Sequence, residues 1–172
     1  DGGRTSKVRG YDPVLDSWCE VASMATKRYC HAAAALGGKL YAMGGSTIDC
    51  GKSLARAESY DPKADSWQPL PSMPTARGSL AAAAVAGKVY AIGGQRFPTQ
   101  DLFDTVEAFD PISGVWYWVT SLPVARGQHT ATAVDGKIYV LGGRITDSEL
   151  VPTNRVDVYD PAADSWQQMA AM

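Results

Sequence analysis

A short pattern recurs through this chain at a nearly fixed step, and this repetition limits the fold more than any other feature. The tryptophans follow one another at 49, 49 and 50 residues, and one double glycine, one tyrosine and one arginine per copy keep the 49-residue step. A step of about 50 residues, marked by the same residue types in each copy, indicates an array of one supersecondary unit. We expect the recurrent glycine, tyrosine and tryptophan residues to be structural: Gly44, Gly45, Gly93, Gly94, Gly142, Gly143, Tyr41, Tyr90, Tyr139, Trp18, Trp67, Trp116 and Trp166.

One copy, residues 74–122, shows what the unit contains. Four short runs of small apolar, β-branched and aromatic residues alternate with Gly, Pro and Asp, which favour turns, and no helical period is sustained. Four antiparallel strands in about 50 residues make one blade of a β-propeller. The alanine-rich first run is predicted to lie innermost, where only small side chains fit. The tryptophan of the fourth run is predicted to fill the gap between neighbouring blades.

The order of these residues resembles the Kelch repeat. A double glycine follows a tyrosine-containing strand, then comes Tyr60-Asp61-Pro62, and Trp67 lies seven residues after the tyrosine. Together with Met73 to Arg77, this variant most resembles the Kelch domain of BTB–Kelch proteins. The resemblance implies an all-β, incomplete Kelch propeller of about three and a half four-stranded antiparallel blades. Complete copies span 25–73, 74–122 and 123–172, and a partial copy, 1–24, carries only the third and fourth strands.

The length of the chain predicts that other residues complete the ring. A six-bladed disc needs roughly 300 residues at about 50 per blade, and the chain has 172. Asp1-Gly2-Gly3 aligns with the end of a second strand, so the first blade lacks two inner strands. Two copies of the chain would lack the same strands. We therefore expect a fragment that docks on the rest of its own propeller.

Composition narrows the classes of partner. The formal charge is −2, with 45% hydrophobic and 20% charged residues, which is ordinary for a globular protein and predicts neither a nucleic-acid nor a membrane partner. The three cysteines, Cys19, Cys30 and Cys50, occupy unrelated repeat positions. This spacing favours reduced thiols in a cytoplasmic or nuclear protein over a disulfide framework.

The recurrent arginines allow two interpretations. They lie just before the innermost strand of each copy, and in Kelch domains that this chain resembles and that bind acidic peptides, arginines at this position line the pocket. The resemblance therefore implies a partner-binding role for Arg28, Arg77 and Arg126. The alternative is an ion pair with Glu58, Glu107 or Asp157, which also recur at one repeat position.

The loops between second and third strands vary most, and variable loops on a rigid repeat are where specificity resides. Two of these loops carry apolar residues, which in an exposed loop are candidate partner anchors. The alternative is that they pack back onto the blade rim. The candidate contacts are Phe97, Leu102, Phe103, Arg144, Ile145 and Leu150.

Three further positions stand out. His31 and His129 share one repeat position, and a buried, hydrogen-bonded histidine is favoured there over a metal ligand, because the sequence supplies no further ligands. Trp118 takes a place that the other copies give to Glu20, Pro69 and Gln168. It predicts a second contact surface on the rim of the disc.

The sequence thus favours a protein–protein interaction module that binds an acidic or partly apolar segment on the loop face. By resemblance, the parent is a candidate substrate adaptor of a cullin ubiquitin ligase. A structural component of a cytoskeletal or other large assembly is the alternative. An enzyme of the Kelch-like oxidase, epimerase or iron-dependent specifier type needs a polar cluster near the axis, and the inner strands are mostly alanine. We therefore expect no enzymatic activity, cofactor or metal.

Overall fold

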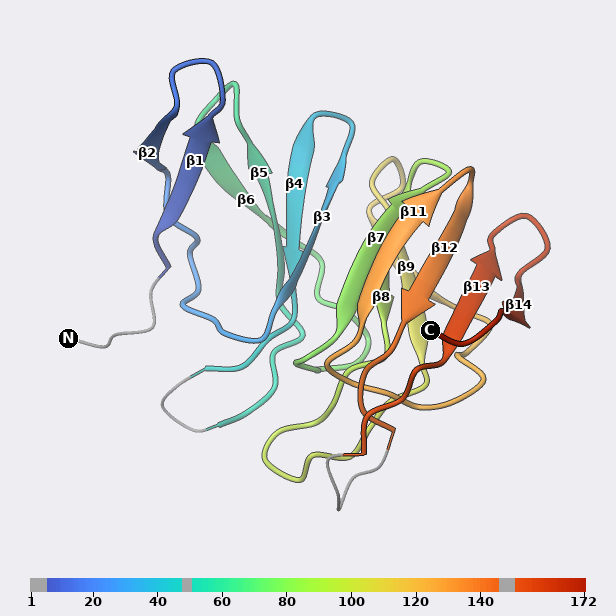
Figure 1. The fold of residues 1–172 in the computed structure, drawn as a ribbon. Coiled ribbons are helices and arrows are strands. Elements are labelled where there is room, and N and C mark those ends of the chain that lie inside the picture. Colours follow the sequence, from blue (N-terminus) through green and yellow to red (C-terminus); the bar gives the residue numbers. More distant parts are fainter. Residues whose placement is uncertain (1–5, 48–50, 146–150) are drawn as a thin grey trace.

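The structure is a computed structural model, and it describes residues 6–47, 51–145 and 151–172. Within these ranges every regular element is a β-strand, and the strands form one two-stranded sheet and three four-stranded antiparallel sheets (Figure 1). This confirms the prediction of an all-β chain with about three and a half blades. The two-stranded sheet holds β1 (Val8–Asp12) and β2 (Ser17–Val21).

Each four-stranded sheet follows the chain order from its innermost to its outermost strand. The first holds β3 (Ala32–Leu36), β4 (Lys39–Met43), β5 (Ala57–Asp61) and β6 (Ser66–Leu70). The second holds β7 (Ala81–Val85), β8 (Lys88–Ile92), β9 (Val106–Asp110) and β10 (Val115–Val119). The third holds β11 (Thr130–Val134), β12 (Lys137–Leu141), β13 (Val156–Asp160) and β14 (Ser165–Gln168).

The alanine-rich strands meet near the centre of the arrangement. β7 contacts both β3 and β11, so the three first strands are neighbours. The described sheets form an arc, with β1 and β2 at one end and the β11–β14 sheet at the other (Figure 1). Small side chains let three strands approach one axis, which confirms the predicted place of the first run in each copy.

The arc has two chemically different faces. All the tight hairpin turns, from that between β1 and β2 to that between β13 and β14, lie on one side, which we call the hairpin face (Figure 1). The connections from second to third strands and from blade to blade lie on the opposite side, the loop face. Alternation of strand direction fixes this separation.

The double glycines bring neighbouring blades into contact. Gly44 and Gly93 have φ of +65° and +54°, a region that residues with a Cβ rarely adopt. A Cβ on Gly44 would lie 2.6 Å from the carbonyl oxygen of Arg77 in the next blade. Gly142 also has a positive φ, but a Cβ there would meet nothing closer than 3.4 Å. Gly142 therefore lacks the close contact between blades, because no further blade packs on it in the described structure.

The recurrent tryptophans tie each blade to the one before it. The indole N–H groups of Trp67, Trp116 and Trp166 donate to the carbonyl oxygens of Ala22, Pro71 and Thr120, at 2.8, 2.9 and 2.9 Å. These acceptors themselves recur at a 49-residue step. Trp18, on the first sheet, is 67% exposed. The hydrophobic cores likewise lie between sheets, one joining β3–β6 to β7–β10 and the other joining β7–β10 to β11–β14.

A second recurrent pair stabilises the turn between the third and fourth strands. The hydroxyl groups of Tyr60 and Tyr159 donate to the carboxylates of Asp65 and Asp164, at 2.8 and 2.6 Å. The β9–β10 turn has Phe109 and Gly114 at these two places. In this blade the tyrosine and the aspartate are therefore both replaced, so that neither a hydroxyl nor a carboxylate is left unpaired.

Cys19 and Cys30 are free, exposed thiols, and Cys50 lies outside the described residues. No helix that is long and apolar enough to cross a membrane occurs in the part of the chain that the structure describes.

Candidate functional site

The buried arginine of each blade lies at the loop face and is held by its own blade. The Nη1 of Arg77 donates to the carbonyl oxygens of Gly93 at 3.0 Å and Thr105 at 2.8 Å. Its Nη2 donates to the carboxylate of Glu107, and both side chains are fully buried. Burial lowers the pKa of Arg77, and the charge of Glu107 raises it again. A guanidinium held on this many sides has no face left for a ligand.

The other two arginines repeat this arrangement. Arg28 binds the carboxylate of Glu58 and the carbonyl oxygens of Gly44 and Arg56. Arg126 binds the carboxylate of Asp157. The structure thus supports the ion-pair alternative, and we correct the expectation that Arg28, Arg77 and Arg126 contact a partner. The physical reason is the acidic residue of the third strand, which lies beneath each arginine.

Arg77 also joins two blades through its backbone. Its N–H donates to the carbonyl oxygen of Leu54 at 3.1 Å, and its own carbonyl oxygen accepts from Gly45 at 2.9 Å. Its side chain, in contrast, binds its own blade, β7–β10. Arg126 accepts from Gly94 at 2.9 Å in the same way. The backbone of the recurrent arginine therefore contacts the double glycine of the preceding blade, while its side chain forms the ion pair of its own blade.

The last blade departs from this pattern because its acid is one methylene shorter. Asp157 also accepts from Arg155, at 2.7 and 2.8 Å. Arg155 occupies the place of Arg56 and Thr105. The Nη1 of Arg126 is buried without a hydrogen-bond partner, whereas the same atom of Arg77 binds two carbonyl groups. The shorter acid is thus accompanied by a second cation and an unsatisfied donor.

The apolar loop after β8 is only partly available. The Phe97 ring contacts the Tyr29 ring, with centroids 6.1 Å apart, and lies against Gly78. Phe103 lies beneath two guanidinium groups, with Arg77 at 5.4 Å and Arg96 at 5.6 Å from the ring centroid. Leu102 lies against Gly127 of the next blade. All three apolar side chains are half-buried, so they pack onto the blade edges and shape the loop.

The loop after β12 contributes a buried cation. Arg144 donates from Nη2 to Gln95 at 2.7 Å and from Nη1 to Gln100 at 3.3 Å, and its Nε is buried without a hydrogen-bond partner. A hollow of about 340 Å³ beside it is lined by Gln128, Gly143, Arg144 and Pro152. Ile145 is half-buried, and Leu150 lies outside the described residues.

Two backbone hydrogen bonds join successive copies at the loop face, just before their first strands. The N–H of Ser79 donates to Cys30 at 2.8 Å, and the N–H of Gln128 donates to Ser79 at 2.9 Å. All three residues have φ between 51° and 57°. They stand two residues after the recurrent arginine in successive copies. The sequence does not reveal this feature, because three different side chains occupy the position.

The two histidines differ in their surroundings. His129 is buried, and neither ring nitrogen has a hydrogen-bond partner. Burial lowers the pKa of His129 to about 4, and the charge of Arg126 lowers it further. The backbone of Ile92 has the opposite, smaller effect on this pKa. For His129, the expected burial is therefore correct, and the expected hydrogen bond is absent among the described residues. His31 is exposed.

Charge separates the two faces of the arc. The described basic residues of the loop face outside ion pairs are Lys27, Lys52, Arg56, Arg96 and Arg144, against the acidic residues Asp101 and Asp104. The hairpin face has the opposite balance. Its acidic residues are Asp12, Asp16, Asp61, Asp65, Asp110, Asp135, Asp160 and Asp164, against Lys39, Lys63, Lys88 and Lys137. Among the described residues, therefore, the loop face carries more basic than acidic side chains outside ion pairs.

Comparison with known proteins agrees with this geometry. The sequence profile of the Kelch motif matches residues 27–74, 76–123 and 125–172. A solved structure titled "Structure of YjhT" superposes with a TM-score of 0.80 at 18% identity, over 91% of this chain. The chain spans 56% of the length of that protein's chain. At this identity the likeness concerns the fold alone. No curated protein matches the sequence.

Proposed function

This chain belongs to the family defined by the Kelch motif, and we propose that it is a protein–protein interaction module whose loop face binds an acidic, partly apolar segment of another protein. The observation that carries this proposal is the charge of the described part of the loop face, where basic side chains outside ion pairs outnumber acidic ones. A face of one sign steers an oppositely charged partner and selects against a basic one.

The residues proposed to contact the partner differ from the recurrent arginines. Arg96 is exposed above Phe103, and Pro98, Thr99 and Gln100 are exposed beside it. Arg144 lines the neighbouring hollow and has one unsatisfied N–H. Together they offer a forked donor for carboxylates and a half-buried aromatic surface, which suits a short acidic segment with one apolar side chain.

The finer assignments are part of the same proposal. The parent protein is proposed to be a BTB–Kelch substrate adaptor of a cullin ubiquitin ligase, acting in the cytoplasm or nucleus, where the exposed thiols of Cys19 and Cys30 stay reduced. The proposal assigns binding, with no catalysis, cofactor or metal. Thermal stabilisation by Fe²⁺ or Zn²⁺ would contradict that assignment, because a specific ligand stabilises the folded state.

Affinity capture tests the proposal. The chain is immobilised as the wild type, as a loop-face variant with Lys52→Glu and Arg96→Glu, and as a hairpin-face control with Lys63→Glu. All three replaced side chains are exposed. Proteins bound by the wild type and the control but lost from the loop-face variant support the proposal. Equal capture by all three chains, or loss from the hairpin-face control alone, contradicts it.

A further inference from the structure

The outer strand of the β7–β10 blade differs from the other outer strands. At the place that Trp118 takes in β10, β2, β6 and β14 carry polar or strand-breaking residues: Glu20, Pro69 and Gln168, the last preceded by Gln167. Charge, proline and short length are the usual protections of a sheet edge against pairing with another chain. β10 reads Val115-Trp116-Tyr117-Trp118-Val119 and has none of these protections.

The free edge of β10 is accessible. It pairs with β9 on one side only, and no backbone hydrogen bond joins it to another strand in the described ranges. Val115 is 54% exposed, Tyr117 36% and Trp118 65%. Trp118 is thus exposed, as the predicted contact surface on the rim requires. A strand with unpaired backbone groups and exposed β-branched and aromatic side chains has the features of a pairing surface.

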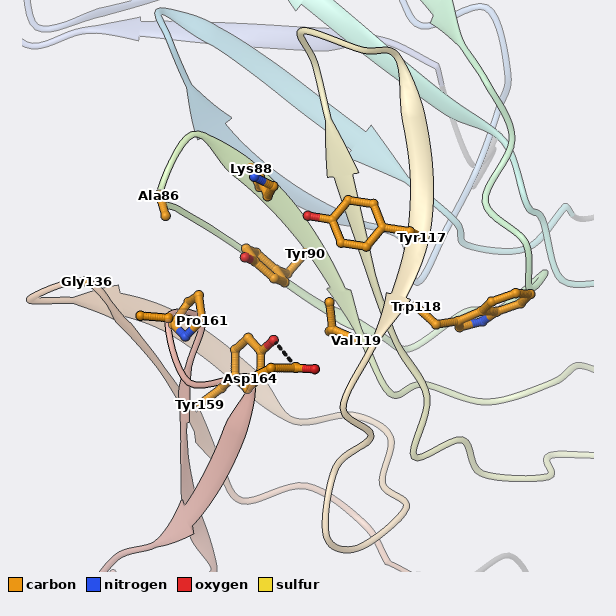
Figure 2. Close-up of a pocket in the computed structure, with 11 residues that line it drawn as sticks. Ala86, Lys88, Tyr90, Tyr117, Trp118, Val119, Gly136, Tyr159, Pro161 and Asp164 are labelled. Atoms are coloured by element: carbon orange, nitrogen blue, oxygen red, sulfur yellow. Dashed lines mark hydrogen bonds between the residues drawn. The ribbon is translucent and has the colours of Figure 1, made fainter.

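Apolar side chains project from both sides of this strand. Tyr117 points into a groove of about 420 Å³ between the β7–β10 and β11–β14 blades, which Tyr90 and Tyr159 also line (Figure 2). Trp118 points away from these tyrosines, on the other side of β10 (Figure 2). Trp118 nevertheless also lines the groove. A strand added beside β10 would cover side chains on both sides.

The sequence of β10 identifies the strand that fits. Val-Trp-Tyr-Trp-Val reads the same in both directions. From this symmetry we infer that β10 pairs antiparallel with β10 of a second copy of this chain, about a two-fold axis that passes beside Tyr117. This self-association does not depend on the partner proposed for the loop face.

The pairing places matched side chains opposite one another. Tyr117 faces its own counterpart, Val115 faces Val119 of the second copy, and Trp116 faces its Trp118. Aromatic and β-branched residues are favourable cross-strand pairs, each contributing about 0.2–1 kcal/mol. An isologous contact of this kind closes as a dimer and does not propagate.

The position of β10 permits this approach. It is the outermost strand of its blade, and β7 lies innermost, so a second molecule reaches the edge along the radius of the arc. Because the paired strands run in opposite directions, the two loop faces point in opposite directions and both stay open. One five-residue strand is small beside the ~1,200–2,000 Å² of stable interfaces, so the dimer is weak.

Sedimentation velocity of the full chain across a concentration series up to about 100 µM, a range suited to a weak interface, tests the inference. We expect a monomer–dimer equilibrium that Tyr117→Lys weakens by about ten-fold or more, because like charges directly opposite in a strand pair repel. Gln68→Lys, at the same place on β6, leaves it unchanged. A wild-type chain that stays monomeric at the top of the series overturns the inference, including the case in which its β10 edge pairs with a peptide from another protein.

A cross-link locates the contact even if the chain also associates through other surfaces. Tyr117→Cys is made in a chain whose three native cysteines are replaced by serine, with Gln68→Cys on the same background as the control. Because opposed Cβ atoms lie about 4.5–5.5 Å apart, a short bismaleimide joins two copies through position 117. A yield no higher than that of the control overturns the inference, whatever the mass in solution.

Discussion

The α-carbon of Gly93 approaches the carbonyl oxygen of Arg126 so closely that a Cβ there would lie 2.6 Å from that oxygen. The contact joins two blades at the loop face, one residue before the hydrogen bond from Gly94 to the same oxygen, which measures 2.9 Å. The double glycine and the arginine that recur in the sequence thus meet in space. The blade interface depends on both.

This contact predicts unequal effects of one substitution at equivalent positions. Gly93→Ala is expected to cost roughly 1–2 kcal/mol for the left-handed backbone and about 1–3 kcal/mol more for overpacking. Gly142→Ala has the same backbone strain with a nearest contact of 3.4 Å, so only the first cost applies. Chemical denaturation of both variants measures the difference. Equal losses would show that the backbone angle alone matters.

The buried ion pair predicts that Arg77 acts on stability. Arg77→Met leaves the Glu107 carboxylate buried without its cation, which costs about 3–5 kcal/mol. A second change, Glu107→Leu, is expected to recover much of this loss, because a buried pair replaced by apolar residues is often nearly neutral. Free energies of unfolding for the single and double variants check this. An Arg77→Met chain as stable as the wild type would refute the structural role.

His129 predicts a loss of stability in mild acid. Its pKa is about 4 in the folded chain and 6.5 as an ordinary value, so between these values the unfolded chain binds the proton and the folded chain does not. Stability therefore falls as the pH drops from about 6.5 to about 4, by up to about 3 kcal/mol. His129→Leu introduces the residue found as Leu80 at the same repeat position. This variant is expected to lose the part of the pH dependence of stability that comes from His129. Wild-type and variant profiles that run parallel from pH 7 to 4 would contradict it.

The tryptophan bonds between blades predict a local effect. Trp67→Phe removes the indole donor to Ala22 and is expected to cost about 0.5–1.5 kcal/mol for the hydrogen bond, in addition to any loss of packing. Trp18→Phe is the control, because Trp18 is 67% exposed and has no preceding blade in the described structure. Thermal melting of both chains makes the comparison. Equal shifts would mean that the bond between blades contributes little.

The repeat made most of the fold predictable. The 49-residue step gave strand number and order, and the alanine runs gave the innermost strands, because both follow from geometry that every blade must satisfy. The joint exchange of Tyr and Asp for Phe109 and Gly114 was also readable from the aligned copies, since a hydroxyl and a carboxylate that bond each other are lost together.

The site was less predictable, because it depends on contacts between copies. The sequence showed that Arg77 and Glu107 recur, but not that the arginine would be fully buried by them. Phe97 reads as an exposed apolar residue until Tyr29 and Gly78 of the loops beside it are placed. The hydrogen-bonded chain of Cys30, Ser79 and Gln128 has no common side chain, since only the backbone takes part.

The most direct test of the account is the dissociation constant of one captured partner protein for the wild type, Arg96→Glu and Lys63→Glu, measured by calorimetry at equal folded fraction. If the basic loop face carries recognition, Arg96→Glu weakens binding by about ten-fold or more, the value of one charge-assisted contact. Lys63→Glu, on the hairpin face, leaves it unchanged. A dissociation constant that Arg96→Glu leaves unaltered, or that Lys63→Glu raises equally, would contradict binding at the loop face.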